Sequence, residues 1–153
     1  MIATVPILTN RIKLLLMKIK IIFIISGVLS FLLMVFPVFL ASAVPSIFEF
    51  FVVDGFGEGI LENKEAVSVF ETFILVMSFM GAAIVFPIFA ALTIKDLEVQ
   101  KKLAFVFGVM LLLVAMPDYI GMMTGGAHPP IEMMVINALV YLLLFYGWKK
   151  GKA

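Results

Sequence analysis

The chain contains four apolar segments that carry almost no charge, and each is about as long as a bilayer is thick. Crossing roughly 30 Å of hydrocarbon takes about 20 helical residues, because each residue adds about 1.5 Å. A helix also satisfies its own backbone hydrogen bonds, which lipid cannot do. The segments lie at residues 21–43, 72–94, 103–123 (with Asp118) and 130–148 (with Glu132). They predict an all-α integral membrane protein with a single transmembrane domain over residues 1–153.

The composition excludes several classes of protein. Of the 153 residues, 64% are hydrophobic and only 14% are charged, which is more apolar surface than a soluble domain of this size can bury. A formal net charge of +1 gives no field that would attract nucleic acid. The chain has no cysteine, so disulfides, thiolate metal sites and cysteine nucleophiles are excluded.

The positive residues are distributed asymmetrically around the four segments. Lysine and arginine in short loops stay on the cytoplasmic side of a membrane. All of them except Lys64 precede the first segment, lie between the second and third, or follow the fourth: Arg11, Lys13, Lys18, Lys20, Lys95, Lys101, Lys102, Lys149, Lys150 and Lys152. This predicts an up-down-up-down four-helix bundle, N-in/C-in, in the cytoplasmic membrane of a prokaryote. We expect the first segment, although followed by Ala41-Ser42-Ala43, to be retained because it exceeds signal-peptide length.

The longest connection, residues 44–66, is predicted to be the outer loop. Residues 54–59 are rich in glycine and acidic side chains, which is typical of a flexible turn. Apolar residues at 47–53 lie just before them. We therefore expect a short segment resting on the outer interface or on a partner.

Three prolines lie within the predicted helices, at Pro37, Pro87 and Pro117. Each frees a backbone carbonyl one turn earlier and favours a kink, which can open a cavity within a bundle. Prolines in transmembrane helices also occur without any binding role. The second helix carries Ser78 among small residues at helical spacing, and we expect this face to point into the bundle.

Four polar residues are the candidate functional cluster: Glu71, Asp118, His128 and Glu132. Asp118 lies about 16 residues beyond Lys102, roughly 24 Å along a helix, so it is the carboxylate expected inside the membrane. Glu71, His128 and Glu132 are expected at the outer boundary. Such groups could form a cation, metal or proton-handling site. Alternatively, Glu71 and Glu132 favour positive helix N-termini, Asp118 forms a hydrogen bond in the kinked region, and His128 is a loop residue. The chain has a single histidine, so it contains no HxxxH or paired-histidine metal motif, and it has no ExxH motif.

Ser78, Asn137 and Tyr141 are candidates for lining a cavity that could hold a quinone or a lipid headgroup. Asn137 and Tyr141 are one helical turn apart. Hydrogen bonds between helices would also explain them. The eleven methionines are interpreted as adaptable packing residues.

These observations lead to three functional hypotheses, and they identify no cofactor and no catalytic residue. The first is a non-catalytic structural or accessory subunit of a larger membrane complex, with lipid and other membrane subunits or a second copy as partners. The second is a ligand-binding or transport protein for a cation, proton, quinone or lipid. The third is a membrane enzyme that acts on a lipid-soluble substrate with Asp118 or Glu71 as acid or base.

Overall fold

The computed structural model describes residues 18–126 and 128–153, and their backbone is almost entirely helical. Four helical stretches are long and apolar enough to cross a membrane, at Ile19–Ala43, Lys64–Thr93, Leu97–Thr124 and Ile131–Lys150. The prediction of an all-α chain with four apolar helices is confirmed. Arg11 and Lys13, which contributed to the predicted orientation, lie outside the described residues.

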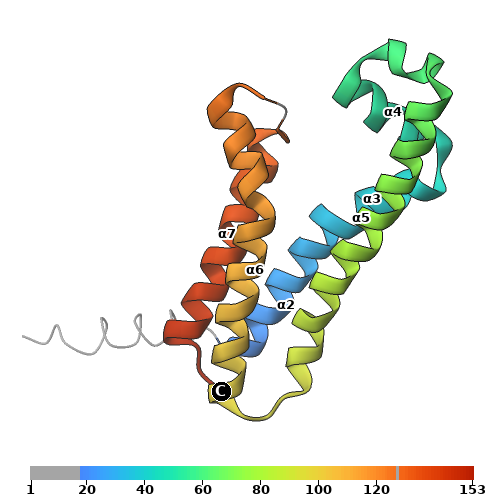
Figure 1. The fold of residues 1–153 in the computed structure, drawn as a ribbon. Helices are drawn as coiled ribbons and strands as arrows, with labels where there is room; N and C mark the ends of the chain where they lie inside the picture. The colour runs from blue at the N-terminus through green and yellow to red at the C-terminus, as the bar shows by residue number, and fades with distance from the viewer. Residues whose placement is uncertain (1–17, 127) are drawn as a thin grey trace, which may run out of the picture.

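Figure 1 shows the elements in chain order, and the first apolar stretch is made of three of them. The π-helix η1 joins two α-helices in that stretch, and the elements η2 and η3 are short 3-10 helices. The bounds are α2 (Ile19–Ser30), η1 (Phe31–Val35), α3 (Phe36–Ala43), α4 (Pro45–Phe56), η2 (Glu58–Glu62), α5 (Lys64–Ala90), η3 (Ala91–Thr93), α6 (Leu97–Thr124) and α7 (Ile131–Lys150).

Helices α5 and α6 begin earlier than hydropathy predicts, because polar caps extend them. The side chain of Asn63 accepts a hydrogen bond from the backbone N–H of Ala66 at 3.1 Å, so α5 begins at Lys64 and not at residue 72. Asp96 accepts from the N–H groups of Glu98 and Val99, at 2.8 and 3.1 Å, so α6 begins at Leu97 and not at residue 103.

The stretch 44–66, which was predicted to be the outer loop with a flexible turn at residues 54–59, contains helices. Val44 is extended, and Pro45 is the first residue of α4. Proline suits this position because it has no backbone N–H that would be left unpaired. Phe48 and Val52 of α4 are buried in a small cluster with Ala41 and Ile74. Apolar burial along α4 therefore outweighs the turn tendency of its glycine-rich end, and Gly57, with φ of 83°, ends the helix.

The first apolar stretch changes to a π-helix at Phe31–Val35, just before Pro37. Pro37 has no N–H, so the ordinary α-helical bond to Leu33 cannot form. The N–H of Phe36 instead bonds to the carbonyl of Phe31, five residues back. A Cβ on Gly81 of α5 would lie 3.2 Å from the carbonyl oxygen of Met34, so α5 approaches this irregular backbone closely. Glycine makes that approach possible.

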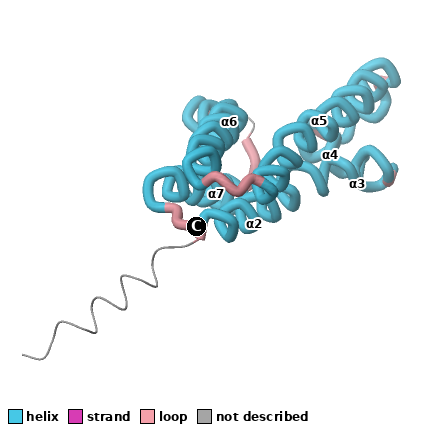
Figure 2. Tube along the Cα trace, turned by 90° about the horizontal axis from the view of Figure 1, so that it is seen from below, coloured by secondary structure: helices cyan, strands magenta, loops and turns pink. Residues whose placement is uncertain are grey.

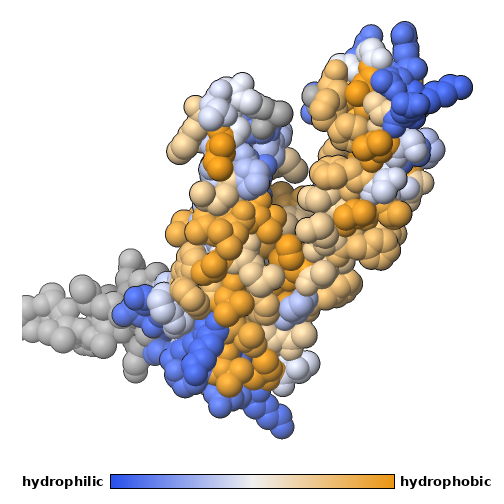
Figure 3. Space-filling view, in the orientation of Figure 1, coloured by the Kyte–Doolittle hydropathy of each residue, from blue (hydrophilic) through white to orange (hydrophobic). Residues whose placement is uncertain are grey.

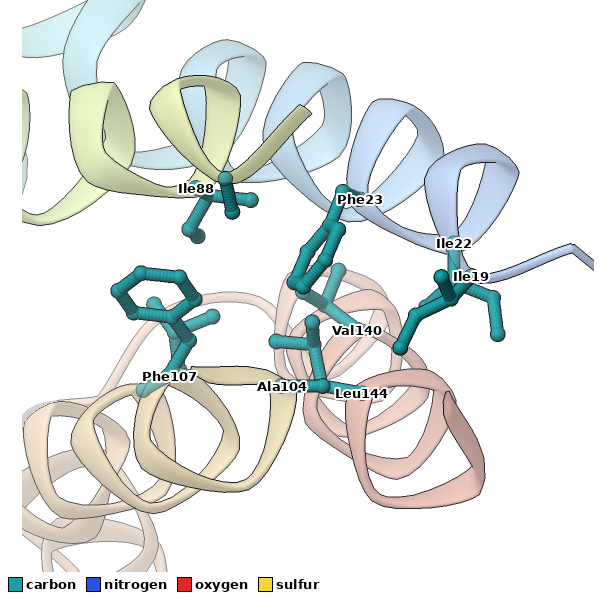
Figure 4. Close-up of a cluster of buried hydrophobic side chains, with 10 residues drawn as sticks. Ile19, Ile22, Phe23, Ile88, Ala104, Phe107, Val140 and Leu144 are labelled. Carbon is teal, nitrogen blue, oxygen red and sulfur yellow. The ribbon is translucent and has the colours of Figure 1, made fainter. Parts of the chain in front are cut away.

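The main hydrophobic core lies where α2 and α6 begin and where α5 and α7 end (Figure 4). Phe23 and Phe107 meet edge to face there, with ring centroids 6.2 Å apart. The core contains Ile19, Ile22, Phe23, Ile88, Ala91, Ala104, Phe107, Leu111, Val140 and Leu144. At the same end the N–H of Ile19 donates to the carbonyl of Lys152 at 2.9 Å. This core joins all four long helices.

Away from this core the helices separate into two parts. Helices α6 and α7 run side by side, whereas α3, α4 and the adjoining half of α5 lean away from them (Figures 1 and 2). We call α6, α7 and residues 125, 126 and 128–130 the α6–α7 hairpin, and α3, α4, η2 and the first half of α5 the distal arm. The distal arm has its own small core around Ile74. The two parts are therefore separated at this end of the predicted four-helix bundle.

The α6–α7 contact depends on a glycine whose replacement should destabilise the protein. A Cβ on Gly108 would lie 2.9 Å from the ring of Phe145, so we expect Gly108→Leu to lower the free energy of unfolding by about 1–3 kcal/mol. Gly59 has no atom within 4 Å of its Cβ position, so Gly59→Leu is the control, with an expected change of about 0.5 kcal/mol or less. Thermal unfolding in mild detergent measures both. Equal melting temperatures would contradict this account of the packing.

Candidate functional site

A cavity of about 310 Å³ lies where the distal arm and the α6–α7 hairpin diverge. The space-filling view shows the surface hollowed between these two parts (Figure 3). All four apolar stretches contribute to its wall: Leu33, Met34, Val38, Met77, Met80, Gly81, Ile84, Leu111, Val114, Ala115, Asp118, Pro129, Met133, Asn137 and Val140. The cavity is thus an interhelical site built by tertiary packing.

The described residues that line this cavity are apolar except for two, Asp118 of α6 and Asn137 of α7. Both are half-buried. Within the described part of the chain, neither side chain forms a hydrogen bond to another residue and Asp118 forms no ion pair; the ion pair found there joins Lys101 to Glu98. The site therefore presents a carboxylate and an amide with free hydrogen-bonding capacity to an otherwise apolar cavity.

The predicted cluster of four residues is only partly assembled. His128 interacts electrostatically with Asp118, and its Nδ1 lies 2.8 Å from the carbonyl oxygen of Pro129 in the cavity wall. Glu132 is exposed in the first turn of α7, where a carboxylate favours the positive helix end. Asp118 and His128 thus belong to the same region, and Glu132 lies outside the wall of the cavity.

Glu71 belongs to a different cavity, so the structure does not bring it to Asp118. It lines a space of about 590 Å³ in the distal arm, together with Glu49 and Thr72. The divergence of the distal arm from the hairpin is the physical reason for this separation. Among the described residues, no three histidine, aspartate or glutamate side chains lie close enough together to hold a metal ion.

The other predicted cavity residues have different roles. Ser78 is buried and donates its hydroxyl hydrogen to the carbonyl of Ile74 at 2.9 Å, within its own helix. The hydroxyl of Tyr141 lies 3.0 Å from that of Tyr119, which also donates to the carbonyl of Met134 at 3.3 Å. Of the three candidates, Asn137 is the one in the cavity wall, and Tyr141 joins α7 to α6.

Sequence reasoning missed the methionine wall of the cavity. Met34, Met77, Met80 and Met133 line it, and they come from η1, α5 and α7. No aromatic residue lines it, although the chain has 16 phenylalanines. Met77 and Met80 are three residues apart and share one face of α5, but no spacing relates them to Met34 or Met133, so the sequence carried no signal that could have grouped all four.

The four long apolar helices indicate a helical, multi-pass membrane protein. Comparison of the chain with protein families, with curated proteins and with solved structures gave no match.

The tyrosine pair should contribute measurably to the α6–α7 contact. Tyr119→Phe and Tyr141→Phe each remove one hydroxyl and keep the ring, so we expect each to destabilise the protein by about 0.5–1.5 kcal/mol. Because the two hydroxyls bond to each other, the double variant should lose less than the two single losses combined. Unfolding in detergent measures this double-mutant cycle, and strictly additive losses would show that the hydroxyls do not interact.

Proposed function

We propose that this protein binds a lipid-soluble molecule with a polar end in the cavity between the distal arm and the α6–α7 hairpin. The observation that carries the proposal is the cavity wall, which is apolar apart from Asp118 and Asn137. Small-molecule sites in proteins are typically concave, mainly apolar and oriented by a few polar groups. This is the ligand-binding or transport hypothesis of the sequence analysis.

The position of the cavity supports entry from the membrane. Met77, Met80 and Val114 line the cavity and are also exposed on the surface of apolar helices, by 37%, 54% and 40%. In a bilayer these residues would face hydrocarbon, so a lipid-soluble molecule could reach the cavity without crossing water. Methionine side chains are flexible and polarizable, and they adapt to ligands of irregular shape.

We further propose that the helices alternate in direction and that both ends of the chain are cytoplasmic, in a prokaryotic cytoplasmic membrane. Two observations support this arrangement. The core combines the beginnings of α2 and α6 with the ends of α5 and α7, and Ile19 bonds to Lys152. All the described lysines except Lys64 belong to the segments at that end. Positive residues of short loops are retained in the cytoplasm.

The absence of native cysteine allows a direct test of this topology. We expect Lys102→Cys and Lys150→Cys to react with a membrane-impermeant maleimide only after the cells are opened. Glu58→Cys in η2 should react in intact cells. Labelling of positions 102 and 150 from opposite sides would contradict the proposed topology.

Ligand binding is tested with a pair of matched tryptophan variants in α7. Met133 is half-buried in the cavity wall, whereas Val135 is 52% exposed and outside it. We expect protein purified in mild detergent to retain a lipid-soluble molecule, detected by native mass spectrometry. Met133→Trp should reduce its occupancy about tenfold because the indole fills the cavity, which corresponds to about 1.4 kcal/mol of binding free energy. Val135→Trp should leave the occupancy unchanged.

Equal occupancy in all three proteins, or none in the wild type, would contradict the proposed ligand site. A co-purifying polypeptide in the same spectra would instead support the accessory-subunit hypothesis. One observation favours that second candidate. The apolar stretches expose Phe39, Phe73 and Phe79, by 59%, 55% and 71%, which either lipid or a partner helix would cover.

A further inference from the structure

The polar groups of the cavity restrict the kind of molecule that it can hold. Resting on the proposed ligand site, we propose that the ligand is a cationic amphiphile: an aliphatic chain that ends in a protonated amine, with the ammonium group held by Asp118 and Asn137. Its chain would lie against the methionine and aliphatic residues of the wall.

The charge balance of the cavity wall favours a cationic headgroup. Of the described residues that line the cavity, none is lysine, arginine or histidine, and Asp118 is the one that carries a charge. An aspartate within a membrane helix costs free energy unless a partner compensates, up to on the order of 2.5–3.5 kcal/mol at the helix centre on insertion scales. An ammonium group within the cavity would supply that partner. An anionic headgroup would face the carboxylate with like charge and is disfavoured.

The hydrogen-bonding capacity of Asp118 and Asn137 also favours an ammonium group. An ionised carboxylate only accepts hydrogen bonds, and an amide adds one further acceptor through its oxygen. Within the described residues, the side chains of Asp118 and Asn137 have no hydrogen-bond partner in the protein. A primary ammonium has three N–H donors, which match the acceptors of these two side chains. A neutral alcohol offers a single donor and no charge.

The apolar residues of the wall favour an aliphatic chain as the rest of the ligand. The lining residues are methionine, aliphatic side chains, one glycine and one proline, apart from the two polar residues, and none is aromatic. A planar ring system would find no stacking partner in this wall. A flexible aliphatic chain needs only dispersion contacts, which deformable methionine side chains supply.

Within the part of the chain that the structure describes, His128 is the group that competes for Asp118. It interacts electrostatically with Asp118 but is exposed, and its Nδ1 lies 2.8 Å from the carbonyl oxygen of Pro129. It forms no ion pair with Asp118 in the described part of the chain. The carboxylate therefore remains open to a cation that arrives through the cavity.

The test compares octylamine, octanol and octanoate, which share one chain and differ in the charge of the headgroup. The full-length protein in neutral-lipid nanodiscs is titrated with each compound, and binding is followed by native mass spectrometry. We expect octylamine to bind at least tenfold more tightly than octanol, and octanoate to bind most weakly. Asp118→Asn should remove the preference, with octylamine and octanol then binding within about twofold of each other.

Two controls separate the chemistry of the ligand from the existence of the site. Glu132→Gln removes the same charge from an exposed carboxylate outside the wall and should keep the full preference for octylamine. Asp118→Glu retains the negative charge and should keep a preference, which distinguishes the loss of charge from misfolding. Met133→Trp should weaken binding of octylamine and octanol alike.

Equal affinities for the three compounds, all weakened by Met133→Trp, would overturn the proposal of a cationic ligand and leave the ligand site intact. Binding that Met133→Trp does not weaken would overturn both. A preference for octylamine that survives in Asp118→Asn would show that the bilayer or another group selects the amine, and would also overturn the assignment to Asp118.

Discussion

The hydrophobic contact among the four long helices at one end of the molecule is the interaction on which the rest of the structure depends. Ile22 of α2, Ile88 of α5, Phe107 of α6 and Leu144 of α7 meet there and are 5% exposed or less. Association of helices in lipid relies on close packing and not on exclusion from water. Where side chains interdigitate, the helices are held together, and where they do not, the helices are free to diverge.

The divergence of the distal arm from the α6–α7 hairpin follows from where close packing ends. Beside the core, Gly147 allows Ile22 to approach within 3.2 Å of its Cβ position. Further along, Gly81 brings α5 against the π-helix, so α5 stays with the first apolar stretch and leaves the hairpin. The cavity forms at this branch point. The π-helix before Pro37 contributes Leu33 and Met34 to its wall, in keeping with the frequent location of π-bulges at functional sites.

The polar residues of the protein fall into two groups with different physical consequences. Those at helix ends, such as Asn63 and Asp96, satisfy backbone N–H groups and set where helices begin. Asp118 and Asn137 lie within helices and face the cavity. A polar group in that position lowers the stability of the protein unless it is paired. The partner of Asp118 and Asn137 is therefore the component of the site that remains to be identified. The proposed cationic ligand provides such a partner.

Much of the secondary structure could be predicted from the sequence, and most of the candidate site could not. The apolar segments were located correctly because the requirement for about 20 apolar residues is local along the chain. The helix starts at Lys64 and Leu97 were missed, although the Asn and Asp caps that set them can be read locally. Helix α4 was also missed, because Phe48 and Val52 gain their burial from contacts with residues of α3 and α5.

The sequence by itself determined that the chain forms four apolar helices, and it marked Asp118 as a carboxylate expected inside the membrane. Tertiary structure alone decided that Glu71 lies in a separate cavity, that Tyr141 pairs with Tyr119, and that four methionines share a wall. Hydropathy and helical period depend on neighbours in the chain. The meeting of side chains from different helices depends on how closely those helices pack and where they part, and no spacing within one segment encodes that.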